Sequence, residues 1–212
     1  MEAKMDLNRL FRSSETSRIS LLVLLTATLL LPVSVVNATP IVFTTTLSGA
    51  NEVPPTPSLG TGTVVVVLDP TAQTIQLNVT FSGLTTNDAA AHIHCCAPLG
   101  TNAGVATTVP AFAGFPLGVT SGTFSGLFSL TDPTFYNPAF VTSHGGTTAS
   151  AEAAFIAGME SGQTYFNIHT GTFPGGEIRG QLVPEPGSLL LLGSGLLGLA
   201  LMQRHRKPIA RS

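Results

Sequence analysis

The chain has 212 residues, 43% of them hydrophobic, and a formal net charge of −2 that is unevenly distributed. Residues 39–183 hold only Arg179 against seven Asp and Glu, a formal net charge of −6, because the other basic side chains lie in the two end segments. One basic side chain cannot neutralise a row of phosphates, which excludes nucleic acid as a partner and makes anionic lipid a poor one.

The first 38 residues have the three parts of a secretory signal peptide. Basic side chains precede an apolar run over 19–36, and small residues follow up to Ala38. This order predicts a signal helix at 1–38, export, and cleavage by signal peptidase after Ala38. An uncleaved signal anchor is the alternative interpretation.

Residues 39–183 are predicted to form a single domain that is large enough to bury its own core. A β-branched run at 63–68 and an alternating run at 75–81 flank a turn at 69–72, which predicts a β-hairpin. Further strands are predicted at 41–47, 89–95, 122–130, 164–169 and 177–183, with one short helix near 150–159 and a long loop over 98–119. Many short strands with frequent turns favour an all-β fold, an antiparallel sandwich or barrel.

Two of the predicted strands carry histidines at positions that can face one another. His92 and His94 share one face of their strand, and His169 shares a face with Tyr165 and Asn167. If these faces pack together, three imidazoles converge, and imidazole is a good ligand for Zn and Cu. The pattern predicts either a Cu or Zn site or, with no metal, histidines that hydrogen-bond the backbone and order the loop after His94. Motifs for catalysis are lacking, so we expect no enzyme.

The two cysteines of the chain, Cys95 and Cys96, are adjacent and directly follow His94. Export would carry them to an oxidising compartment, where thiols tend to pair. Three interpretations stay open: a vicinal disulfide that stiffens the turn, thiolate ligands beside the histidines, or bonds to another chain and free thiols. If the strand continues past His94, only Cys96 shares the histidine face.

Arg179 is the only cation of residues 39–183. On the predicted last strand it shares a face with Glu177. We expect a partly buried ion pair with Glu177 or Glu52 that ties the last strand to the first, in preference to a role in ligand binding.

Four sequence blocks occur in a characteristic order: LSGANEVPP at 47–55, AHIH at 91–94, YFNIHT at 165–170 and PGGEIRGQL at 174–182. Together they resemble the CHRD domain, the module first described in chordin, over about residues 44–182. The resemblance implies a β-rich extracellular module and does not imply an enzyme.

The last segment, 184–212, has three parts: Pro184-Glu185-Pro186, an apolar run over 188–202, and a basic cluster at 204–207. The run has 15 residues, fewer than the roughly 17–25 of a normal spanning helix, and the basic cluster favours a cytoplasmic end. This hydrophobic helix and its flanks resemble the PEP-CTERM sorting signal. The resemblance implies an inner-membrane intermediate, recognition by an exosortase, removal of the tail and release to the cell surface or extracellular matrix. An ordinary C-terminal membrane helix is the alternative.

Together these features predict an exported, non-enzymatic surface or matrix protein. It would need no cofactor and would meet exopolysaccharide of a biofilm or other surface proteins. The alternative function is an extracytoplasmic Cu- or Zn-binding protein that uses His92, His94 and His169.

Overall fold

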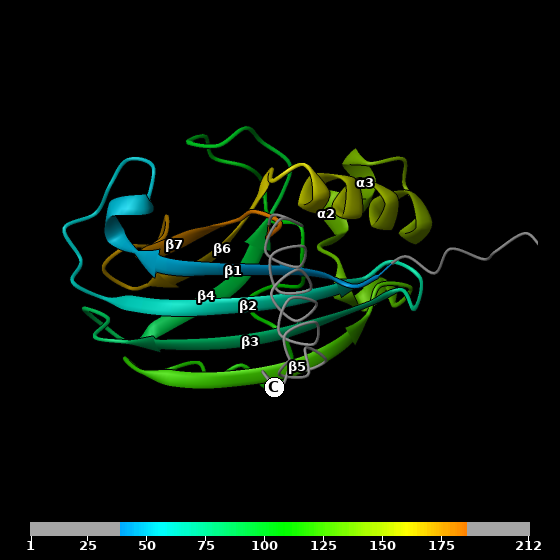
Figure 1. The fold of residues 1–212 in the computed structure, drawn as a ribbon. Helices are drawn as coiled ribbons and strands as arrows, with labels where there is room; N and C mark the ends of the chain where they lie inside the picture. The colour runs from blue at the N-terminus through cyan, green and yellow to red at the C-terminus, as the bar shows by residue number, and fades with distance from the viewer. Residues whose placement is uncertain (1–38, 186–212) are drawn as a thin grey trace, which may run out of the picture. The chain divides into compact units, whose positions relative to one another are not determined.

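Seven antiparallel strands form one sheet, in the order β4-β6-β7-β1-β2-β3-β5, that curls into a half-barrel around its inner face (Figure 1). The computed structural model describes residues 39–185. The strands are β1 (Ile41–Ser48), β2 (Thr61–Asp69), β3 (Thr74–Ser82), β4 (Asp88–His94), β5 (Gly122–Ser129), β6 (Thr164–Thr170) and β7 (Ile178–Leu182). The helices are η1 (Gly49–Asn51), η2 (Pro133–Phe135), α2 (Pro138–Ser143) and α3 (Thr148–Glu160).

The architecture confirms the predicted all-β class and places a strand in each predicted strand segment. The predicted signal helix and the C-terminal hydrophobic helix lie outside the described residues. Within residues 39–185, no helix has the length and apolar character needed to span a membrane.

Strands β2 and β3 form the hairpin that the alternation predicted, and they pair over their whole length. The turn begins at Asp69, whose carboxylate accepts hydrogen bonds from the backbone N–H groups of Thr71 and Ala72 at 2.9 and 2.8 Å. This local bonding is why Asp favours turns. Alternate residues of β2, such as Val64 and Val66, are buried on the inner face, as period-two alternation requires.

The core lies on the inner face of the sheet and contains many phenylalanines. Phe112, from the long loop predicted over 98–119, stacks on Phe166 of β6 with ring centroids 6.3 Å apart. It also contacts Phe124 and Phe128 of β5. The loop therefore fills the half-barrel with buried side chains, because an open curled sheet would otherwise leave its apolar face in water.

Helix α3 packs Phe155 and Met159 into the same core. It is slightly longer than the predicted 150–159, because Thr147 caps the first turn and accepts a hydrogen bond from the backbone N–H of Ser150. Helix α2 was not predicted. It has six residues, too few to show a helical period in the sequence.

Strands β4, β6 and β7 differ from the rest of the sheet because their outer face is also covered. Every residue of β6 is buried. Segments 49–58 and 98–104 lie over this outer face and are held by hydrogen bonds, such as that from Asn51 Nδ2 to the carbonyl oxygen of Arg179 at 3.1 Å. The result is a buried polar layer on the side of the sheet opposite the apolar core.

Candidate metal centre

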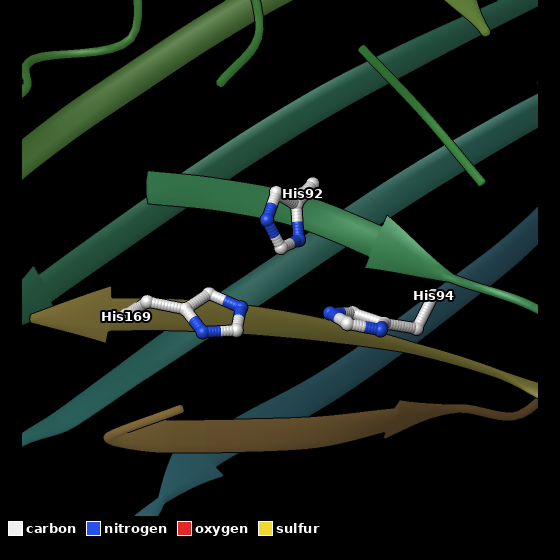
Figure 2. A group of neighbouring side chains, drawn as sticks. All are labelled: His92, His94 and His169. Atoms are coloured by element: carbon white, nitrogen blue, oxygen red, sulfur yellow. The ribbon is translucent and has the colours of Figure 1, made fainter. Parts of the chain in front are cut away.

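The pairing of β4 with β6 places three histidines together in this polar layer. His92 lies opposite Asn167, His94 lies opposite Tyr165, and His169 lies opposite Ala90. Paired residues of antiparallel strands point to the same face, so the three imidazoles share the covered outer face. Figure 2 shows one ring nitrogen of each turned toward a common point. The ring centroid of His92 lies 4.5 Å from that of His169 and 4.8 Å from that of His94.

Two of the rings are oriented by the backbone. The Nδ1 of His94 lies 2.8 Å from the carbonyl oxygen of Ala103, and the Nδ1 of His169 lies 3.0 Å from that of Pro174. A carbonyl only accepts, so each Nδ1 carries the proton and each Nε2 keeps a free lone pair. This is the arrangement by which proteins orient metal-ligating histidines.

The remaining ring nitrogens are buried and unsatisfied. Within the described part of the chain, His94 Nε2, His169 Nε2 and His92 Nδ1 have no hydrogen-bond partner. One ligand atom from each histidine lies within 4.8 Å of the others. Two nitrogens bound to one Zn ion, each about 2.0–2.1 Å from it, lie at most about 4.2 Å apart. A bound ion would therefore draw the rings slightly closer.

Burial keeps the three rings neutral. It lowers the pKa of His92 to about 3 and that of His94 to about 4, and the neighbouring imidazoles add to the effect. Burial also lowers the pKa of His169. Neutral imidazole is the form that binds a metal, so a metal ion at this cluster would not have to displace ring protons from imidazolium groups at neutral pH.

Tyr165 and Arg179 form a stack of side chains that packs against the ring of His94. The ring of Tyr165 stacks on that of His94 with centroids 4.6 Å apart, and the guanidinium carbon of Arg179 lies 3.4 Å from the centroid of Tyr165. Because β6 lies between β4 and β7, Tyr165 is the middle layer of this stack. The backbone N–H of Ala103 donates to the Tyr165 hydroxyl at 3.1 Å, so Tyr165 also holds the residue that orients His94.

The ion pair expected for Arg179 is not formed. Arg179 instead donates from Nη1 to Asn102 Oδ1 at 3.0 Å and from Nη2 to the carbonyl oxygen of Thr101 at 2.9 Å. Within residues 39–185 neither Glu177 nor Glu52 bonds to it. The prediction failed because β7 begins only at Ile178, so strand alternation does not extend to Glu177.

The carboxylates of Glu177 and Glu52, the two expected partners of Arg179, lie in different environments. Glu177 accepts hydrogen bonds at 2.6 Å from Ser58 Oγ, Thr170 Oγ1 and the backbone N–H of Thr85. Glu52 is 5% exposed, and burial raises its pKa to about 7, while the charge of Arg179 opposes the rise. Glu177 thus ties loops to the sheet without Arg179, and Glu52 is half protonated near neutral pH.

The Sγ atoms of Cys95 and Cys96 lie bonded to each other, as in a vicinal disulfide. Both face Gly158 of α3. The condition under which Cys96 would share the histidine face, a strand that continues past His94, is not met, because β4 ends at His94 and the chain bends at Cys96. Within the described residues, neither sulfur belongs to the histidine group.

Close packing at Gly158 gives a testable expectation. A Cβ atom at this position would lie 2.7 Å from Cys96 Sγ and still closer to Cys95 Sγ. Gly158→Ala is therefore expected to lower the free energy of unfolding by about 1–3 kcal/mol, the usual cost of overpacking. Urea denaturation measures this. Ala157→Gly, on the exposed neighbouring position, is the control for helix propensity, and equal stability of wild type and Gly158→Ala would contradict the packing.

Comparison with protein families identifies the domain. The model of the CHRD domain matches residues 43–182, which contain the whole histidine cluster. The chain belongs to the CHRD domain family. A second model, the PEP-CTERM protein-sorting motif, matches residues 182–207. No curated protein and no solved structure matches the chain.

The two matches confirm both resemblances drawn from the sequence. The sorting motif indicates a protein exported through the membrane to the cell surface or extracellular space and sorted by an exosortase. The CHRD domain and the sorting motif are not enzyme families. Of the motif, Pro184 and Glu185 lie at the end of the described residues beside β1, and Pro186 lies outside them.

The residues that sequence reasoning missed are Asn102, Thr101 and Ala103, which lie in the loop over the polar layer and contact Arg179, Tyr165 and His94. No sequence signal identifies them, because two of the three contacts use backbone atoms.

Proposed function

We propose that the CHRD domain of this exported protein is a non-enzymatic surface module that binds one Cu or Zn ion through His92, His94 and His169. The observation that carries the proposal is the set of three buried, unpartnered ring nitrogens that face one another. A buried polar atom without a partner costs about 1–3 kcal/mol, and one ion would satisfy all three.

The interpretation without metal accounts for only part of the arrangement. His94 and His169 do hydrogen-bond backbone carbonyl groups and hold the loops that carry them. Those bonds use one nitrogen of each ring and leave the other facing the cluster. The same bonds are the usual outer support of a metal-ligating histidine, so they favour the metal site as much as the purely structural role.

The proposed ion would stabilise the fold by linking two neighbouring strands. β4 is an edge strand of the sheet, and the ion would join its two histidines to His169 of the neighbouring strand β6. A ligand that binds only the folded state stabilises it by about 2.7 kcal/mol when its concentration is 100 times its dissociation constant. The donor set consists of three neutral nitrogens, which suits Cu or Zn better than Mg or Ca.

We also propose exopolysaccharide or other surface proteins as partners of the mature domain. The supporting observation is the exposed outer face of β1, β2, β3 and β5. Thr46, Thr63, Thr80 and Thr123 lie side by side across these four strands and line an open groove of about 870 Å³. Uncharged hydroxyl side chains suit hydrogen bonding to a neutral polymer.

Metal analysis tests the proposed site. The exported protein, saturated with Cu(II) or Zn(II) and desalted, is expected to retain one ion per chain. His92→Ala, His94→Ala and His169→Ala should each weaken binding at least about 100-fold in a competition titration, since three ligands fall to two. The matched control is His144→Ala, at the end of α2 and outside the cluster, which should bind as wild type. Loss of the ion from wild type on desalting, or equal affinity of all four variants, would refute the site.

A further inference from the structure

The sorting motif continues the sheet. Ser48 of β1 pairs with Arg179 of β7, and Phe43, five residues earlier on β1, pairs with Pro184, five residues later in the chain. The register is therefore unchanged from β7 into the motif. The backbone N–H of Glu185 donates to the carbonyl oxygen of Val42 at 2.9 Å, as the next pair of the same ladder requires.

A side-chain contact adds to this pairing. Thr44 Oγ1 donates a hydrogen bond to the carboxylate oxygen Oε1 of Glu185 at 2.7 Å. The two residues are diagonal neighbours across the strands, a position from which side chains reach one another. Thr44 thus holds the acidic residue of the motif on the outer face of β1.

There is no linker between the folded domain and the motif. Leu182 is fully buried in the core, and Val183 is the single residue between it and Pro184. An enzyme that recognises a linear motif must reach its backbone and side chains, but in the folded domain the backbone N–H and the carboxylate of Glu185 are both engaged by β1.

We propose that β1 restrains the sorting motif, so that exosortase processing of the folded chain requires Pro184 and Glu185 to separate from Val42, Phe43 and Thr44. Only a few contacts at the end of a ladder must open, and such ends open far more readily than the core. The restraint therefore slows processing without blocking it, and it lengthens the life of the membrane-attached intermediate. The effect rests on the sorting motif and is independent of the proposed metal site.

Pulse-chase labelling of the full-length chain in its own cells tests the restraint. The measured quantity is the half-life of the unprocessed form. Insertion of Gly-Ser-Gly-Ser between Val183 and Pro184 displaces the motif from its register and is expected to shorten the half-life at least about threefold. Thr44→Val, which removes only the hydroxyl contact with Glu185, is expected to shorten it about twofold.

Two matched controls separate restraint from general damage. Thr74→Val removes a hydroxyl group from β3, a strand that pairs with β2 and β5 and not with the motif. The same four-residue insertion between Gly145 and Gly146 lengthens an exposed loop far from β1 in the chain. Both should process as wild type. A half-life that the Val183–Pro184 insertion and Thr44→Val leave unchanged or lengthen would overturn the proposal, because the enzyme would then accept the paired motif.

Discussion

Arg179→Ala is expected to lower the free energy of unfolding by about 3–5 kcal/mol. Arg179 is 2% exposed, and its guanidinium makes two hydrogen bonds to the loop at Thr101 and Asn102 and stacks on Tyr165. Hydrogen bonds to a charged group are worth about 1.5–3 kcal/mol each, and the truncated side chain also leaves a cavity. Glu177 does not share this loss, since it has other partners.

The loss should appear in stability before it appears in metal binding, because Arg179 bonds none of the three histidines and reaches His94 only indirectly, through Tyr165 and through the loop at Thr101 and Asn102. Urea denaturation measures the first quantity and a Zn(II) competition titration the second. Arg179→Lys is the matched control: it keeps the charge but cannot make the forked pair of hydrogen bonds, so it should recover less than half of the loss. A melt of Arg179→Ala at the wild-type midpoint would contradict this role.

Acidification from pH 6.5 to pH 4.5 is expected to destabilise the metal-free domain by at least about 2 kcal/mol. The pKa of His92 is about 3 and that of His94 about 4 in the folded state, and burial also lowers the pKa of His169. A histidine with a depressed pKa contributes stability that is complete above its unfolded pKa, about 6.5. That stability is lost as the pH falls, because these histidines bind protons in the unfolded chain but remain neutral in the folded chain.

Glu52 acts in the opposite direction over part of this range. Its pKa is raised from 4.5 to about 7, so between these values the folded state holds a proton that the unfolded state has released. Stability from this group therefore falls as the pH rises. His92 and His94 alone outweigh this one carboxyl, which leaves a net slope of at least about 1 kcal/mol per pH unit near pH 5.5, and His169 acts in the same direction.

Urea denaturation in EDTA at a series of pH values measures the slope, and two variants assign it. Glu52→Gln removes the opposing proton and should steepen the slope by up to about 1.4 kcal/mol per pH unit. His92→Asn removes one of the three depressed groups and should make the slope shallower. A stability that stays constant from pH 6.5 to pH 4.5 in wild type would show that the histidines are not buried as described.

Most of the strands could be predicted because their signal is local. The residues of β3 alternate between buried and exposed, and the turn before it is stabilised by its own Asp69. The long loop over 98–119 was also predicted, but its role in the core was not. Phe112 packs against residues of β5 and β6, and nothing in the loop sequence states which strands it will meet.

The three histidines of the candidate site could be predicted from the sequence, but the residues that orient them could not. Strand alternation places His92 and His94 on one face, and the structure adds His169 through the pairing of β4 with β6. The expected partners of Arg179 were wrong because alternation was extended beyond the start of β7. Whether Cys96 joins the histidine face depended on where β4 ends, which the sequence left open and the structure places at His94.

The amino-acid sequence by itself determined the β class, the hairpin and the sorting motif, since each depends on residues that are neighbours in the chain. The tertiary structure alone decided the order of the strands, the loop that covers the histidines, the partners of Arg179 and the pairing of the motif with β1. These depend on contacts between segments far apart in sequence, such as Val42 with Glu185. Burial and competition among many hydrogen-bond donors and acceptors select such contacts, and no local pattern encodes the outcome.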